Sequence, residues 1–123
     1  MSPELAGAKF INLVTFRKDG REVSTPVWFV ALDGKLYCYT NGLTGKVKRI
    51  RASRRVRIAA SDVRGRPLGG WSEGTGRVVE APEQERRVYE ALATKYGLTY
   101  WALTFFARLG GKLKERIALE LAV

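Results

Sequence analysis

The stretch from Leu36 to Ala60, LYCYTNGLTGKVKRIRASRRVRIAA, constrains the fold of this sequence most strongly. It predicts a strand, a turn punctuated by glycine, a short basic helix and a second strand. Val47 and Ile50 lie three residues apart, so we expect both to face inward from the helix. Together with the strand patterns on either side, this order of elements predicts a small antiparallel barrel with peripheral helices.

The rest of the chain extends this pattern. Pro26 lies inside the second predicted strand and cannot donate a ladder hydrogen bond, so it predicts an edge strand or a bulge. Asp33-Gly34 predicts a two-residue hairpin turn, and Pro82 and Gly97 predict the two ends of a helix. The predicted strands cover residues 10–17, 22–32, 35–40, 55–61, 71–79 and 114–123, and the predicted helices cover 44–53, 82–96 and 99–109. The 123 residues show no linker or repeat, which suits a single domain, 1–123.

Charge points to an anionic partner. The sequence has 22 Lys and Arg against 12 Asp and Glu, a formal net charge of +10. Nine of the basic residues lie between Leu43 and Leu68 and are opposed only by Asp62. Such a stripe attracts nucleic acid, a cofactor rich in phosphate or carboxylate, or an acidic protein. Because the stripe lacks the interleaved aromatic residues of a single-strand binding platform, nucleic acid is disfavoured. A solvated basic face without a dedicated ligand is the alternative.

Several kinds of site are excluded by composition. The sequence has no histidine, which removes the commonest general base, the Ser-His-Asp triad and most zinc sites. We therefore assign no metal site and no catalytic residue, and we expect any catalysis to depend on a bound cofactor or on electrostatics. The single cysteine, Cys38, lies in a predicted strand and is expected to be inert packing. Without an apolar leader or an apolar run near 18 residues, we expect a cytoplasmic protein outside the membrane.

The start of the short helix is the predicted anion site. Thr44 can cap the helix, Gly45 lets a ligand approach the backbone, and Lys46 adds a cation on the first turn. Arg49 lies one turn further on. Unpaired backbone N–H groups and these two cations suit a phosphate. In the alternative, Thr44 serves only as a cap, and Lys46 and Arg49 are exposed helix side chains.

Four segments in order, TFRKDGREVSTPVWFV, LYCYTN, TGKVKRIRASRRVRIA and EGTGRVVE, carry a family resemblance. The chain resembles the pyridoxamine-phosphate-oxidase-like split-barrel flavoproteins, and within them the actinobacterial branch that uses the deazaflavin coenzyme F420. The resemblance covers residues 10–123. It implies a mainly β fold, a six-stranded antiparallel split β-barrel with short peripheral helices, and a homodimer whose cofactor groove lies between the subunits.

The resemblance also implies where the cofactor binds. The segment from Thr25 to Trp28 of the second strand would lie along the ring system of the cofactor. The end of the third strand and the start of the helix would bind the phosphate. The segment from Trp71 to Gly74 would come from the neighbouring subunit. With Arg49 added from its place on the helix, the candidate residues are Thr25, Pro26, Val27, Trp28, Tyr39, Thr40, Asn41, Thr44, Gly45, Lys46, Arg49 and Trp71. Trp28 and Tyr39 sit in β-rich runs, so ordinary packing is their alternative role.

The predicted function follows from the resemblance and the basic stripe. FMN oxidases of the family carry an Arg-Lys pair at the helix start, whereas this chain has Gly45-Lys46, a departure that favours F420 over FMN. We expect an F420-dependent oxidoreductase that transfers a hydride between the reduced deazaflavin and a small organic substrate. The alternatives are an FMN-binding oxidoreductase of the same fold and a non-catalytic F420-binding or carrier protein. The aromatic segment from Tyr100 to Phe106 would line a lipophilic substrate pocket or, more simply, serve packing.

Overall fold

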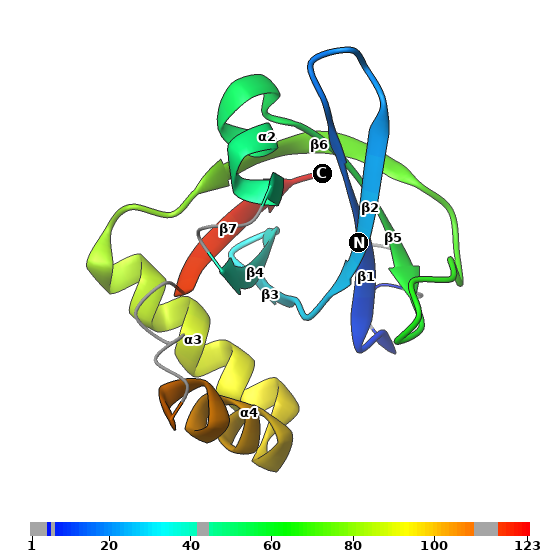
Figure 1. Cartoon of the computed structure of the whole chain (residues 1–123). Helices are drawn as coiled ribbons and strands as arrows, with labels where there is room; N and C mark the ends of the chain where they lie inside the picture. Colours follow the sequence, from blue (N-terminus) through cyan, green and yellow to red (C-terminus); the bar gives the residue numbers. More distant parts are fainter. Residues whose placement is uncertain (1–4, 6, 42–44, 110–115) are drawn as a thin grey trace.

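The computed structural model describes residues 5, 7–41, 45–109 and 116–123, and among these residues seven strands form one antiparallel sheet (Figure 1). The strands are β1 (Phe10–Phe16), β2 (Glu22–Val27), β3 (Val30–Leu32), β4 (Lys35–Asn41), β5 (Arg55–Ser61), β6 (Ser72–Val78) and β7 (Arg116–Ala122), and the helices are α2 (Gly45–Ser53), α3 (Pro82–Tyr96) and α4 (Leu98–Leu109). The mainly β antiparallel fold with peripheral helices is as predicted.

The order of strands in the sheet is β2-β1-β5-β6-β7-β4-β3. The sheet curls, so that β2 at one edge comes near β4 at the other side. α2 lies against β1 and β6, while α3 and α4 lie together at a different end of the barrel (Figure 1). The last strand of the chain, β7, pairs with both β6 and β4 and so joins the two halves of the sheet.

The predicted count of six strands is wrong, because the second predicted strand is two strands among the described residues. The break falls at Trp28 and Phe29, not at Pro26. The Phe29 N–H donates to the Tyr96 hydroxyl at 3.0 Å, and its carbonyl accepts from Lys95 Nζ at 2.8 Å. The backbone of Phe29 is therefore satisfied by side chains of α3, and the chain can leave β1 and join β4 without losing hydrogen bonds.

The local predictions for β2, for the turn at Asp33-Gly34 and for α3 are confirmed. β2 is an edge strand, and its Pro26 pairs with Asn12 of β1. An edge strand is where a residue without an N–H is tolerated. Asp33 and Gly34 both have positive φ, 53° and 79°, which is the type I′ geometry of a two-residue hairpin. α3 begins with proline and ends before Gly97, as predicted. The predicted end of α4 at Gly110-Gly111 lies outside the described residues.

Two apolar clusters stabilise the fold. The barrel core lies inside the curled sheet and is mostly aliphatic: Ile11, Leu13, Val27, Phe29, Leu36, Cys38, Ile50, Val56, Ile58, Leu119 and Leu121. The helix-side cluster lies between the sheet and α3 and is rich in tyrosine: Val30, Tyr37, Val88, Leu92, Tyr100 and Ala118, with Trp28, Tyr39, Tyr89 and Tyr96 packed against them. β4 contributes to both clusters, because successive side chains of a strand point to opposite faces.

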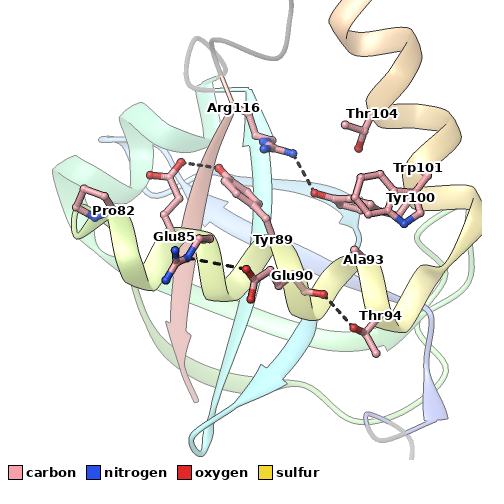
Figure 2. A pocket seen from close by; sticks show the side chains of 11 residues that line it. Pro82, Glu85, Tyr89, Glu90, Ala93, Thr94, Tyr100, Trp101, Thr104 and Arg116 are labelled. Atoms are coloured by element: carbon pink, nitrogen blue, oxygen red, sulfur yellow. Dashed lines mark hydrogen bonds and ion pairs between the residues drawn. The ribbon is translucent and has the colours of Figure 1, made fainter.

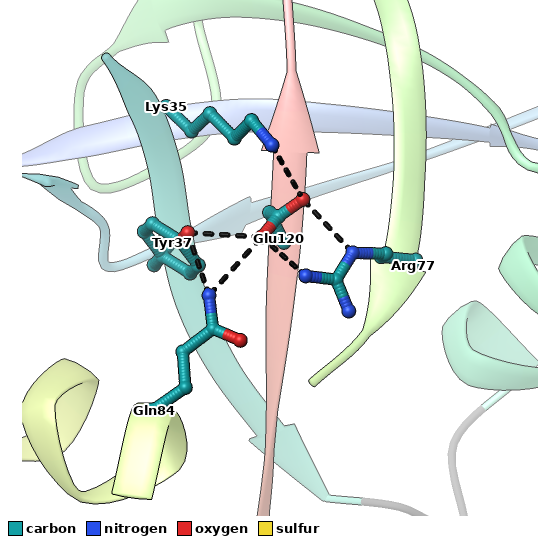
Figure 3. Close-up of polar contacts among 5 residues, drawn as sticks. All are labelled: Lys35, Tyr37, Arg77, Gln84 and Glu120. Carbon is teal, nitrogen blue, oxygen red and sulfur yellow. Dashed lines mark hydrogen bonds and ion pairs between the residues drawn. The ribbon is translucent and has the colours of Figure 1, made fainter. Parts of the chain in front are cut away.

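Glu120 on β7 is the centre of a polar network (Figure 3). Its side chain is 5% exposed and accepts two hydrogen bonds from Arg77, at 2.9 and 2.7 Å, and one from the Tyr37 hydroxyl at 2.9 Å. Lys35 and Gln84 also donate to it, at 3.3 and 3.2 Å. Burial alone would raise the pKa of Glu120, but the bonds from Arg77, Tyr37 and Lys35 lower it to about 2. The carboxylate thus connects β4, β6 and α3 to β7.

Candidate functional site

The first turns of α2 hold the two basic residues that the sequence singled out. Val47 and Ile50 are buried, and this anchors the helix on the sheet and fixes the direction of its other side chains. Arg49 Nε donates to the Thr15 hydroxyl of β1 at 2.7 Å. A Cβ at Gly45 would come within 2.5 Å of Arg49 Nη1. Gly45 therefore leaves room for the Arg49 guanidinium, a role that the sequence alone did not reveal.

Lys46 is half-buried, although we expected its side chain to be exposed when no phosphate is bound. Burial lowers the pKa of Lys46, and the Arg49 charge lowers it further, although the Cys38 thiol acts in the opposite direction. Burial also lowers the pKa of Arg49, and Arg17 adds to this effect. Within the described ranges, neither Lys46 nor Arg49 has an ion pair. Two partly desolvated cations without a carboxylate create a local field that favours an anion.

An open hollow of about 440 Å³ lies beside this pair, between α2 and the turn that joins β1 to β2. It is lined by Arg17, Lys18, Asp19, Arg21, Gly45, Lys48 and Arg49. The one carboxylate in it, on Asp19, is engaged by Arg21 at 2.7 Å. The remaining charges are positive, so the hollow extends the cationic surface beyond Lys46 and Arg49. We call Arg17, Lys18 and Lys48 the basic rim.

The candidate residues on β2 and β4 fall on different faces of the sheet. Thr25 and Val27 pair with Leu13 and Ile11 of the barrel core, and Val27 is buried there. Thr40 is half-buried and lies two residues from Cys38, hence on the same face of β4. Ile50 of α2 belongs to the barrel core, so α2 is anchored on this interior side of the barrel.

Trp28 and Tyr39 lie elsewhere. The Trp28 ring stacks on Tyr96 of α3, with centroids 4.2 Å apart and planes within 7°. Its edge meets Tyr39 at 6.4 Å, and Tyr39 in turn contacts Tyr89 and Tyr100. Because Tyr39 and Cys38 are neighbours in a strand, they point to opposite faces. Both aromatic residues thus belong to the helix-side cluster, as their alternative role predicted.

Pro26 and Trp71 share the outer face of the sheet. Pro26 pairs with Asn12, which pairs in turn with Ala59 on β5, and the Trp71 ring lies 4.9 Å from the Arg57 guanidinium of the same strand. Trp71 is 41% exposed. Of the remaining candidates, Asn41 is the last residue of β4, and Thr44 lies outside the described residues. In one chain, the predicted residues thus occupy three separate surfaces.

None of the described helices is both long and apolar enough to cross a bilayer. The part of the chain that the structure describes also contains no cluster of three or more His, Cys, Asp or Glu suited to a metal ion. Cys38 is fully buried, and burial raises the pKa of its thiol to about 12, although Lys46 acts against this. The thiol is therefore protonated and packed, in agreement with the prediction for this residue.

Comparisons with known proteins were made for the sequence and for the fold. A sequence model described as pyridoxamine 5'-phosphate oxidase matches residues 1–123. No curated protein matched the sequence.

Solved structures share the fold at low identity. The heme storage protein HutZ from Vibrio cholerae is 14% identical, with a TM-score of 0.72 over 96% of this chain and 83% of that one. A conserved hypothetical protein from Mycobacterium tuberculosis is 21% identical, with a TM-score of 0.72 over 98% of this chain and 79% of that one. An FAD-binding protein from Mesorhizobium loti is 16% identical, with a TM-score of 0.67 over the whole of this chain and 90% of that one.

Proposed function

Since this chain belongs to the pyridoxamine 5'-phosphate oxidase family, we propose that it is an F420-dependent oxidoreductase. It would transfer a hydride between the reduced deazaflavin and a small organic substrate. The observation that carries the proposal is the pair of partly buried cations, Lys46 and Arg49, which have no carboxylate partner among the described residues. The family commonly binds phosphate-bearing flavins, and such a phosphate supplies the charge that this pair lacks.

The residues present fit the anionic part of such a cofactor. Lys46 and Arg49 occupy the first turns of α2, where backbone N–H groups and the helix dipole also favour negative charge. The hydroxyls of Thr25 and Thr40 lie on the same interior side of the barrel and add neutral hydrogen-bonding groups. The bound cofactor would supply the hydride chemistry, while these residues bind the phosphate, orient the ring and limit access of water.

The basic rim favours F420 over FMN. FMN has one phosphate, and Lys46 and Arg49 are enough to neutralise it. The rim adds Arg17, Lys18 and Lys48 around the 440 Å³ hollow next to Gly45. F420 has a phosphodiester and an oligoglutamate tail, so its several carboxylates would use these additional cations.

Two alternatives stay open to test. An FMN-binding or FAD-binding oxidoreductase is favoured by the family description and by the FAD-binding relative from Mesorhizobium loti. A cofactor carrier without turnover would use the same α2 site and needs no substrate pocket. The heme storage relative from Vibrio cholerae is an example of this fold in a storage protein.

We further propose a cytoplasmic homodimer. Within one chain, Trp71 lies on the outer face of the sheet. The partner subunit's Trp71 would therefore complete a groove whose other side is formed by α2 and β2. Other exposed apolar residues, Leu103 and Phe105 of α4, are further surface that a dimer would bury. A single buried thiol without a disulfide suits a reducing compartment.

Titration of the purified protein with F420 and with FMN, followed by fluorescence, tests the proposal. We expect F420 to bind at least ten times more tightly, a difference of about 1.4 kcal/mol. A double variant of the basic rim, Lys18→Ala with Lys48→Ala, should weaken F420 binding and leave FMN binding nearly unchanged. Equal affinity for the two cofactors in the wild type, or protein that purifies with tightly bound FMN, would contradict the assignment.

A further inference from the structure

A second cavity lies between α3 and α4, on the far side of β4 from α2. Figure 2 shows it from close by, with side chains of both helices and of β7 around it. Its volume is about 740 Å³, within the range of roughly 300–1,000 Å³ that is typical of small-molecule sites. The lining residues that matter for its chemistry are Tyr89, Ala93, Tyr100, Trp101, Thr104 and Arg116.

The walls of this α3–α4 cleft are aromatic and apolar. Tyr100 is 3% exposed and forms the inner wall, and the Trp101 ring meets it edge-on at 5.5 Å. Trp101 is 60% exposed, so much of its indole ring is open to solvent. Ala93 on α3 also lines the cleft, and its small side chain leaves space there. A flat apolar molecule placed here would bury aromatic surface on more than one side.

Arg116 supplies the polar end of the cleft. Its guanidinium lies 3.7 Å from the Tyr89 ring centroid, and its Nη1 donates to the Tyr100 hydroxyl at 3.0 Å. A guanidinium has five N–H donors, and among the described residues only the Tyr100 hydroxyl accepts from this one. Within the part of the chain that the structure describes, Arg116 forms no ion pair.

The other charged groups of the cleft have partners. Glu85 accepts a hydrogen bond from the Tyr89 hydroxyl at 2.8 Å, and Arg86 faces Glu90 at 3.9 Å on the exposed side of α3. Figure 2 places the Arg116 guanidinium between the Tyr89 ring and the Tyr100 hydroxyl. Among the described groups that line the cleft, Arg116 is thus the cation without an ion pair, while the Glu85 carboxylate is held by the neutral Tyr89 hydroxyl.

We propose that the α3–α4 cleft binds a small organic carboxylate with a flat apolar body. The carboxylate accepts hydrogen bonds from the other N–H groups of Arg116, which match its geometry. The body lies against Tyr100 and Trp101. The rigid position of Arg116 on the Tyr89 ring means that little side-chain freedom is lost on binding.

This site is separate from the proposed cofactor site. The cleft is on the helix-side face of β4, which carries Tyr39, while α2 is anchored through Ile50 in the barrel core on the face that carries Cys38. Ligand binding in the cleft therefore does not depend on whether F420, FMN or no cofactor occupies the α2 site.

Calorimetric titration with 2-naphthoate, compared with the neutral 2-naphthylmethanol, tests the proposal. We expect the acid to bind at least about tenfold more tightly, because hydrogen bonds between a guanidinium and a carboxylate are stronger than those to a neutral hydroxyl. Arg116→Gln should remove this preference while the alcohol still binds. Ala93→Phe should fill the cleft and abolish binding of both compounds.

Arg87→Gln is the matched control for Arg116→Gln. Arg87 lies on α3, but it pairs with Asp33 and does not line the cleft. It should bind both compounds like the wild type. The comparison of acid and alcohol on the wild type needs no variant, so it holds even if Arg116→Gln fails to fold. Equal binding of the two compounds, or no binding of either, overturns the proposal. If the acid does not bind and Ala93→Phe changes the sedimentation coefficient, a second copy of the chain occupies the cleft instead.

Discussion

The barrel core and the helix-side cluster are built in part from the same strands, yet they differ in chemistry. The barrel core is mostly aliphatic, and Ile58, Leu119 and Leu121 within it have no exposed surface. The helix-side cluster is dominated by tyrosine and tryptophan, and it borders the open α3–α4 cleft. Alternation along β4 and β7 assigns residues to one side or the other.

The difference shows what each cluster contributes. Aliphatic side chains fill space without polar demands, so the barrel core fixes the fold. Tyrosines bring a hydroxyl at the end of each ring, and here these hydroxyls bind Glu120, Glu85, the Phe29 backbone and Arg116. The helix-side cluster therefore has polar groups at defined positions next to apolar surface, which is the composition of a ligand site.

Removal of a barrel-core side chain should have the largest effect. We expect Leu119→Ala to lower the free energy of unfolding by about 3–4 kcal/mol, because it leaves a cavity in a fully buried site. Leu98→Ala on α4 is the control, and at 88% exposure it should cost less than about 0.5 kcal/mol. Urea denaturation measures both. Similar losses for the two variants would mean that the barrel core is not the main source of stability.

Glu120 lies on the helix-side face of β7, and its loss should have the next largest effect. We expect Glu120→Gln to cost about 2–3 kcal/mol, less than a fully enclosed ion pair because Arg77 and Lys35 remain partly hydrated. The pKa of Glu120 is lowered in the folded state, so its contribution is complete above the unfolded pKa near 4.5 and is lost as pH falls toward 2. Across this pH interval, the free energy of unfolding should change less with pH for the variant than for the wild type. An equal pH dependence of the two proteins would contradict the network.

Lys46 should affect binding without affecting folding, the reverse of Leu119. We expect Lys46→Ala to weaken cofactor binding by about 1.5–3 kcal/mol, the range for hydrogen bonds to charged groups. The free energy of unfolding should change by less than about 0.5 kcal/mol, since no described residue pairs with Lys46. Arg51→Ala on the exposed side of the same helix is the control. Unchanged affinity in Lys46→Ala would remove this residue from the site.

Tyr96→Phe should have the smallest effect of these changes. Its hydroxyl accepts from the Phe29 N–H and lies 2.7 Å from the Lys9 carbonyl, so the variant loses about 1–2 kcal/mol of stability. Hydrogen exchange should show faster exchange at the Phe29 amide with little change in the barrel core. Unchanged exchange at this amide would mean that the break between β2 and β3 is held by other contacts.

Much of the fold was predictable from local patterns. Local strand patterns predicted β1, β5 and β7, and the Asp33-Gly34 turn and Pro82 marked boundaries correctly. The break at Phe29 was not predictable, because the partners of its backbone groups, Lys95 and Tyr96, are more than 60 residues away. The continuous strand pattern of residues 22–32 does not indicate that the Tyr96 hydroxyl takes the place of a neighbouring strand as a hydrogen-bond partner.

The candidate site was predictable only in part. The cations of α2 follow from charge and helix phase, and the structure holds them close to one another. The positions of Trp28 and Tyr39 depend on which face of β4 meets α3, which no local pattern records. Arg116 gave no signal, because a basic residue at the start of a strand is ordinary until Tyr89 and Tyr100 are seen around it. Glu120 alternates with Leu119 and Leu121, and no local pattern indicates that Arg77 and Tyr37 meet at its carboxylate.

The place of β7 in the sheet has a consequence for synthesis of the chain. The ladder of β2, β1 and β5 and the hairpin of β3 and β4 are complete once residue 61 has been made. The facing edges of β4 and β6 receive their partner only when residues 116–122 are added. Nascent chains therefore carry unpaired strand edges until β7 has been made, and such edges invite pairing with other chains. Before that point, nascent chains on neighbouring ribosomes are available for such pairing.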